Sequence, residues 1–167
     1  MKKICYHNCM NEVSVNFNKP PAITHKNPQE KPPGKNYLGI DYGAKRIGLA
    51  TSTGIISTPL ATIPNSSQSI KQIQDIIKTY NIDTIIIGLP LYKDGNESPM
   101  SLAVRDFGKN FENVEYHNEI FTSREAEEHI RQNLGISNPK KIREIVDRVA
   151  ASMILSSWLY GKKGNNK

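Results

Sequence analysis

Residues 37–52 read YLGIDYGAKRIGLATS, two short apolar runs joined by a charged turn. In the first run the apolar Leu38 and Ile40 lie two residues apart, and such alternation is typical of a β-strand with one apolar face. Gly39 and Asp41 then lie on the opposite face. The second run, RIGLATS, has the composition of another strand, and the turn between the two runs is short enough for an antiparallel hairpin. The stretch therefore predicts a hairpin whose first strand ends in a carboxylate.

Beyond this hairpin the hydrophobic pattern predicts further elements in the order β-β-β-α-β-α-β-α-α. The expected strands cover 37–41, 46–52, 55–63, 83–90 and 114–119, and the expected helices cover 66–80, 99–112, 123–134 and 139–160. Three strands joined by hairpins, followed by strands that are reached through helices, imply a mixed five-stranded sheet with an antiparallel three-strand edge and a parallel centre. This α/β order, with helices flanking the sheet, is that of the ribonuclease H-like fold.

The chain has 167 residues, enough for one domain that buries roughly 70% of its unfolded surface. Residues 1–35 are expected to form a flexible N-terminal extension, because they hold five of the ten prolines and show little periodicity. Residues 36–161 are expected to form the ribonuclease H-like domain, and residues 162–167 a short basic tail.

The composition restricts the partners of the protein. No apolar run approaches the ~18 residues that cross a bilayer, and no apolar signal segment follows the N-terminal lysines, so we expect a cytoplasmic protein without a membrane partner. The formal charge is +6, but residues 1–36 hold six lysines against two glutamates, while residues 37–167 hold sixteen basic against fourteen acidic residues. This balance permits a nucleic-acid partner without demanding one.

Three acidic residues lie at key points of separate elements: Asp41 ends the first predicted strand, Glu119 ends the fifth, and Asp147 lies in the last helix. Asp147 is on the flank of the apolar stripe of its helix, and the small Ala150 and Ala151 would let this helix approach the sheet closely. Three carboxylates brought together repel one another unless cations lie between them. Hard oxygen ligands in an incomplete shell suit Mg²⁺ or Mn²⁺, and two such ions about 3.5–4 Å apart can activate a water for phosphodiester hydrolysis.

Two cations follow the first of these acids. Lys45 and Arg46 lie four and five residues after Asp41, so they can hold the phosphate backbone of a nucleic acid beside a metal site. They can equally be the solvated side chains of an exposed turn.

Each acid also has an ordinary structural explanation. Asp41 can simply begin the turn that follows it. Glu119 can be an exposed acid at a strand end, and Asp147 can pair with Arg143 one helical turn earlier. From the residues alone these explanations stay open.

Four segments, in this order and approximate spacing, resemble the YqgF (RuvX) family: GIDYGAKRIGLA, IIIGLPLYKDGNESP, HNEIFTSREAE and IVDRVAASMIL. The resemblance spans residues 37–160, and it implies a ribonuclease H-like fold and cleavage of Holliday junctions or of precursor 16S ribosomal RNA. The residues that match the family's metal-binding acids and its basic pair are Asp41, Glu119, Asp147, Lys45 and Arg46. Residues 88–91 and 94–95 match two further elements, in a loop that is expected to border the site.

The chain departs from the family pattern at the end of the fifth strand. The family usually reads Asp-Glu-Arg there, whereas this chain reads Asn118, Glu119 and Ile120. The acid is present and the arginine is not, so the resemblance implies weaker or differently assisted cleavage. Tyr92 also replaces a more usual asparagine in the loop after the fourth strand.

The leading hypothesis is a metal-dependent nuclease that uses Mg²⁺ or Mn²⁺ and processes the 5′ end of pre-16S rRNA, with structured RNA and ribosomal precursor particles as its partners. The same residues suit a resolvase of branched, four-way DNA, and both a monomer and a homodimer are open. A second class is a non-catalytic nucleic-acid-binding or ribosome-assembly factor. A third is an ATP-binding module, which the chain disfavours because it contains one phosphate loop where such folds need two.

Overall fold

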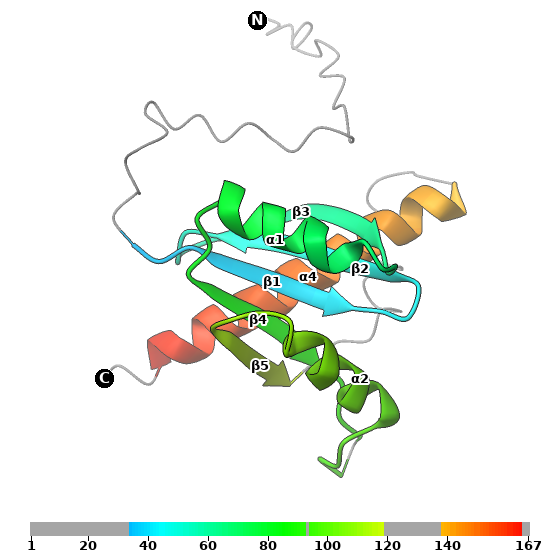
Figure 1. The fold of residues 1–167 in the computed structure, drawn as a ribbon. Coiled ribbons are helices and arrows are strands. Elements are labelled where there is room, and N and C mark those ends of the chain that lie inside the picture. The colour runs from blue at the N-terminus through cyan, green and yellow to red at the C-terminus, as the bar shows by residue number, and fades with distance from the viewer. Residues whose placement is uncertain (1–33, 93, 119–137, 165–167) are drawn as a thin grey trace, which may run out of the picture.

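The computed structural model describes residues 34–92, 94–118 and 138–164, and Figure 1 shows their arrangement. The elements are β1 (Tyr37–Tyr42), β2 (Arg46–Ser52), β3 (Ser57–Pro64), α1 (Ser69–Thr79), β4 (Thr84–Leu89), α2 (Pro99–Gly108), β5 (Val114–Asn118) and α4 (Pro139–Gly164). The helix expected over 123–134 lies outside the described residues, as do the first 33 residues of the expected extension. None of the helices in the described part of the chain has the length and hydropathy to cross a bilayer.

The five strands form one mixed sheet in the order β3-β2-β1-β4-β5. Strands β3, β2 and β1 pair in antiparallel fashion, and β1, β4 and β5 pair in parallel. This confirms the predicted α/β, ribonuclease H-like fold with its antiparallel three-strand edge. Because β1, β4 and β5 run in the same direction, their carboxyl ends lie along one edge of the sheet, where β2 begins.

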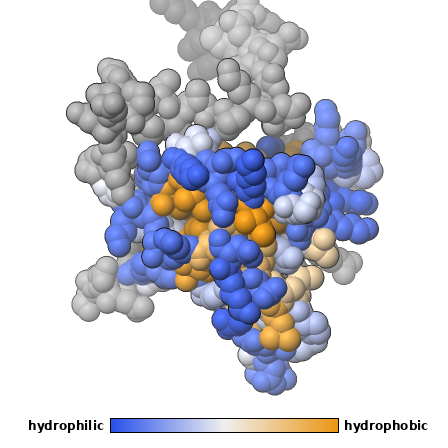
Figure 2. All heavy atoms as spheres, viewed as in Figure 1, coloured by the Kyte–Doolittle hydropathy of each residue, from blue (hydrophilic) through white to orange (hydrophobic). Residues whose placement is uncertain are grey.

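Helices α1 and α2 lie on one face of the sheet, and α4 crosses the other diagonally (Figure 1). We call these the α1–α2 face and the α4 face. The α1–α2 face is filled by large apolar side chains from the sheet and the two helices, namely Leu38, Ile40, Ile47, Leu49, Leu60, Ile73, Ile85, Ile87, Leu89, Val104 and Phe107. Figure 2 shows apolar side chains at the centre of this side of the molecule and hydrophilic ones around them.

The α4 face is lined by smaller side chains where the helix crosses β1 and β2. Gly39 pairs with Ala50, and both face α4. A Cβ atom on Gly39 would lie 2.7 Å from the carbonyl oxygen of Ala151 and 2.8 Å from Cβ of Leu155. These distances are too short for real atoms, so α4 rests on the backbone of β1, as the small residues at 150 and 151 predicted.

Some predicted boundaries were wrong. Strand β3 begins at Ser57 and not at 55, because Ser52 and Ser57 close the β2–β3 hairpin and the left-handed Gly54 (φ +101°) turns the chain between them. Ile55 and Ile56 are therefore left exposed in the turn. Helix α2 ends at Gly108 and α4 continues to Gly164, in contrast to the expected ends near 112 and 160.

Candidate active site at the carboxyl end of β1

Asp41 lies next to the last residue of β1 and points to the α4 face. Its antiparallel partner in β2 is Gly48, and directly paired residues project to the same side of a sheet. Gly39, two residues earlier on the same strand, faces α4 as well. Asp41 is half-buried, and it makes an interaction within the protein. The strand alternation predicted from the sequence is thus the arrangement that the structure has.

Gly48 brings Asp147 to the same place. A Cβ atom on Gly48 would overlap the carbonyl oxygen of Asp147, so the backbone of α4 lies directly on the backbone of β2 at this point. Gly48 is also paired with Asp41 in the sheet. The part of α4 that contains Asp147 therefore lies over the Asp41–Gly48 pair. The two acids therefore come from elements 106 positions apart in the chain and lie at one end of the α4 face.

Asp147 binds the guanidinium of Arg46, the first residue of β2. Nε of Arg46 donates to Oδ2 of Asp147 at 2.5 Å, and Nη2 donates to Oδ1 at 3.4 Å. The hydrogen bond to Asp147 raises the pKa of Arg46 above its ordinary value, although partial burial acts in the opposite direction. Asp147 therefore forms its ion pair with Arg46 of β2 and not with Arg143 of its own helix.

Lys45 differs from Arg46 although the two are neighbours. Its side chain is exposed, and its backbone carbonyl accepts a hydrogen bond from the amide of Asn65 at 3.0 Å. The side chain of Asn65 donates to the carbonyl of Gly43 at 2.9 Å, and Gly43 itself donates to the carbonyl of Arg46 at 2.9 Å. The turn backbone is thus fixed by three hydrogen bonds while the Lys45 side chain extends into solvent.

The loop after β4 is closed by its own polar groups. Asp94 accepts two hydrogen bonds from Asn96, at 3.0 Å from the backbone and 2.9 Å from the side chain, and these lower the pKa of Asp94. Ser98 caps α2 together with Ser101, and both hydroxyls donate to the carbonyl of Pro90. Because β4 is parallel to β1, this loop leaves the sheet at the same edge as Asp41.

Strand β5 ends at Asn118, and the side chain of the preceding residue, His117, faces α4. Nε2 of His117 lies 2.9 Å from Oγ of Ser157, and burial lowers the pKa of His117. Glu119 and Ile120 follow immediately in the chain and lie outside the described residues. The predicted third acid is therefore not placed here.

The described acids offer oxygen ligands to a metal from two sides. Among residues 34–92, 94–118 and 138–164, no group of three or more His, Cys, Asp or Glu side chains could hold a metal ion. Asp41 and Asp147 supply two carboxylates, which are the hard donors that Mg²⁺ and Mn²⁺ prefer. The guanidinium on Asp147 shows that this position accommodates a cation. The donor chemistry therefore fits a divalent ion that is completed by further ligands.

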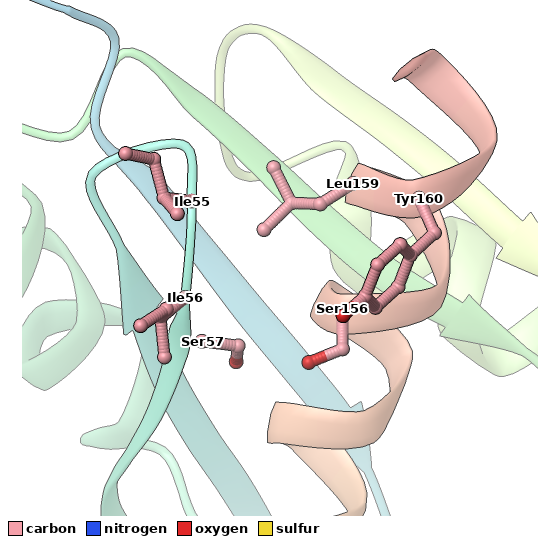
Figure 3. A pocket seen from close by; sticks show the side chains of 6 residues that line it. All are labelled: Ile55, Ile56, Ser57, Ser156, Leu159 and Tyr160. Carbon is pink, nitrogen blue, oxygen red and sulfur yellow. The ribbon is translucent and has the colours of Figure 1, made fainter. Parts of the chain in front are cut away.

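A pocket at the opposite end of α4 has different chemistry (Figure 3). It is lined by Ile55 and Ile56 from the β2–β3 turn, by Ser57 at the start of β3, and by Ser156, Leu159 and Tyr160 from α4. Nine residues of helix separate Asp147 from Ser156, a rise of about 13 Å. The pocket offers apolar surface and hydroxyl groups and no carboxylate, so it lacks the ligands for the predicted reaction.

Two functional features escaped the sequence reasoning. Gly48 was not singled out, although its place opposite Asp41 follows from pairing the two strands of the hairpin. Arg46 was predicted as a phosphate ligand, and the structure shows it bound to an acid of the same site. Its alternation with Gly48 was the available signal, because residues 46 and 48 of one strand share a face.

The chain is similar to known proteins over the residues that form this fold. The family described as RuvX, Holliday junction resolvase, matches residues 35–161. A protein of Crocosphaera subtropica that bears the name pre-16S rRNA nuclease is 37% identical over 131 residues, which are 73% of this chain and 90% of the relative. A protein of the same name from Syntrophus aciditrophicus is 38% identical over 131 residues, 73% and 86% of the two chains.

Two solved structures of resolvases match the chain at low sequence identity. Thermus thermophilus RuvC has a TM-score of 0.44 and 14% identity, and the match covers 77% of this chain and 96% of the other. Fowlpox virus resolvase, in complex with Holliday junction DNA, has a TM-score of 0.46 and 16% identity, over 75% of this chain and 97% of the other.

Proposed function

This chain belongs to the RuvX family, and from that premise we propose that it is a nuclease that hydrolyses phosphodiester bonds in nucleic acid. Its substrate is the 5′ end of precursor 16S rRNA, the RNA for which its relatives at 30–38% identity are named. A cytoplasmic location belongs to the same proposal.

One structural observation supports the proposal. Asp41 and Asp147 lie at the same end of the α4 face because Gly48 is both the sheet partner of Asp41 and the residue on which the backbone of Asp147 rests. Two acids from distant elements at one sheet edge, with cations beside them, suit phosphodiester hydrolysis by bound metal ions. A purely structural acid would not need a partner acid on the facing helix.

Asp41 and Asp147 would hold a divalent ion, Mg²⁺ or Mn²⁺, and Glu119 is proposed as the third ligand because it follows the last residue of β5. When bound, such an ion supplies a water of lowered pKa and neutralises charge on the leaving oxygen. The remaining oxygens of the carboxylates would accept hydrogen bonds from the attacking water and orient it.

Lys45 is the residue proposed to receive the substrate. Its exposed ammonium group belongs to the turn directly before Arg46, and it forms no ion pair with a described residue. A compact ammonium on a flexible stem binds a phosphate as a point charge. Lys45 therefore attracts the nucleic-acid backbone while the two acids face the bond to be cut.

A four-way DNA junction is the second candidate substrate, favoured by the description of the family that matches residues 35–161. The same acids and cations serve both substrates, because both reactions hydrolyse a phosphodiester. A junction has two equivalent strands to cut and suits a homodimer, whereas one RNA end is served by a monomer. The oligomeric state on each substrate therefore helps to distinguish them.

The test is cleavage of a 5′-extended 16S precursor RNA with Mg²⁺ or Mn²⁺, with a four-way DNA junction in parallel. Asp41→Asn removes a carboxylate from the site, and we expect kcat/KM to fall by about 10²- to 10³-fold. Asp75→Asn is the matched control, because it makes the same chemical change on an exposed position of α1 on the opposite face. Cleavage of neither substrate, with RNA still bound, would leave the non-catalytic assembly factor as the function.

A further inference from the structure

The ion pair between Arg46 and Asp147 uses both oxygens of the carboxylate. Oδ2 accepts from Nε at 2.5 Å, and Oδ1 accepts from Nη2 at 3.4 Å. The two side chains are 34% and 18% exposed, so the pair is shielded from water more than a surface pair. A divalent ion needs at least one of these oxygens, and two cations that share one carboxylate repel each other. Arg46 and the metal are therefore competitors for Asp147.

The competing cation is held at this position by the strand. Arg46 and Gly48 share the α4 face of β2 by alternation, and Gly48 brings the backbone of Asp147 onto that strand. Lys45 precedes the strand, in the turn, and its side chain is exposed. Two neighbouring basic residues with the same charge thus have different surroundings, one on an acid of the site and one in solvent.

We propose that Arg46 is an internal counter-ion of the site: it neutralises Asp147 while no metal is bound, leaves the carboxylate when a divalent ion binds, and then becomes available to the substrate phosphate. This inference rests on the proposed nuclease function. It gives the two basic residues different metal dependences. Lys45 can bind nucleic acid with or without metal, whereas Arg46 can bind it only when metal is present.

Physical reasons favour such a counter-ion. Two neighbouring carboxylates without a cation repel each other, and Arg46 provides the neutralising charge in the metal-free protein. Glu144, one turn before Asp147 in α4, adds to the negative field that acts on Arg46. A guanidinium held near the site and released by metal binding also couples the two requirements of cleavage, since phosphate binding becomes strongest when the metal is present.

The first measurement is Mn²⁺ binding by calorimetry, at one pH and without nucleic acid. We expect Arg46→Ala to bind Mn²⁺ about 3- to 10-fold more tightly than the wild type, because a charge-assisted competitor is lost. Lys45→Ala is the matched control: it removes the same charge one residue away, and its affinity should stay within about 2-fold of wild type. Arg46→Lys, which keeps one cation but loses the bidentate pair, should fall between them.

Three results would overturn the inference: equal tightening in Arg46→Ala and Lys45→Ala, weaker binding in Arg46→Ala, or no Mn²⁺ binding by the wild type. The first would reduce the role of Arg46 to net charge, and the second would make it a structural support of Asp147. Thermal melting of each variant accompanies the titration. If Arg46→Ala does not fold, Arg46→Lys carries the same comparison.

The second measurement is binding of a 5′-extended precursor RNA in two states of the protein. In EDTA we expect Lys45→Ala to weaken binding by about 3- to 10-fold and Arg46→Ala to leave it unchanged. In Ca²⁺, an oxygen-seeking ion used here in place of the catalytic one, both variants should weaken it. An equal loss in both variants in EDTA contradicts the inference. Neither measurement needs turnover, so failure to cleave RNA would overturn the proposed function and leave these results to be judged separately.

Discussion

The two faces of the sheet are built by opposite means. On the α1–α2 face, long apolar side chains such as Ile40 and Ile87 fill the space between the sheet and two helices. On the α4 face, at Gly39 and Gly48, side chains are absent and the helix backbone rests on the strand backbone. Both arrangements bury a face of the sheet. Large side chains cover the α1–α2 face, whereas the helix backbone itself covers the α4 face at the two glycines.

The difference shows why the site lies where it does. On the α1–α2 face the interposed side chains set the distance between helices and sheet, whereas backbone contact sets the height and position of α4 above β1 and β2. Asp147 is carried by the fixed helix and Asp41 by the fixed strand. The α1–α2 face therefore supplies much of the stability, and the α4 face supplies the geometry of the acids.

The largest expected effect comes from removing a large buried side chain of β4 from either face of the sheet. Ile87→Ala and Ile86→Ala remove neighbouring, fully buried isoleucines of β4 that point to the α1–α2 face and the α4 face, respectively. Each should lower the free energy of unfolding by about 2–5 kcal/mol, measured by urea denaturation. At a temperature where both variants are folded, only Ile86→Ala should also weaken Mn²⁺ binding, because it leaves a cavity under α4. Equal metal affinities would show that the two faces do not divide their tasks in this way.

Filling the α4 face should cost less stability and more function. Gly48→Ala places a methyl group where the carbonyl of Asp147 lies, so α4 must move away from β2. We expect a loss of about 1–3 kcal/mol in the free energy of unfolding and at least a 10-fold loss of cleavage. Gly161→Ala is the control, since a Cβ there meets nothing within 4 Å, and it should stabilise α4 by about 0.5–1 kcal/mol. Full activity in Gly48→Ala would contradict the close-approach explanation of the site.

A polar contact at the far end of α4 should matter less than either change. Nε1 of Trp158 donates to Oε2 of Glu115 at 3.0 Å, and Trp158 is nearly buried between β1 and β5. Trp158→Phe keeps most of the apolar contact and removes the donor, at an expected cost of about 0.5–1.5 kcal/mol in the free energy of unfolding. Glu115→Gln, which keeps an acceptor oxygen, should cost less. Metal affinity should not change in either variant.

The smallest expected effect depends on pH. Burial lowers the pKa of His117 from its ordinary value of 6.5, so the folded protein favours the neutral ring and the unfolded chain binds the proton more strongly. Stability from this group is therefore present above pH 6.5 and is lost as the pH falls below it. The melting temperature of the wild type should fall more between pH 7.5 and 5.5 than that of His117→Gln. A larger fall in the variant would reverse the assigned sign.

The order of strands and helices was enough to predict the fold, and strand alternation was enough to predict the orientation of Asp41, because both patterns depend on neighbouring residues alone. The pairing of Arg46 with Asp147 joins residues 101 positions apart, and only the height of α4 above β2 creates it. The exposed Ile55 and Ile56 were assigned to a strand on composition, but the glycine turn overrides their preference. The start of α1 was wrong for a similar reason. The helix was expected from residue 66, whereas it begins at Ser69, whose hydroxyl donates to the carbonyl of Ser66 in the turn ahead of it.

Asn36 has a mechanical consequence for whatever is joined ahead of it. Its backbone amide donates to Oδ2 of Asp83 at 2.8 Å, and its side-chain amide donates to the carbonyls of Tyr80 and Asn81. A pull on the chain at Gly34 would thus load the α1–β4 junction before it reached the hairpin that carries the acids. Tags, tethers or fused domains attached before Asn36 should therefore leave the acids undisturbed, because the hydrogen bonds of Asn36 hold the chain at this point.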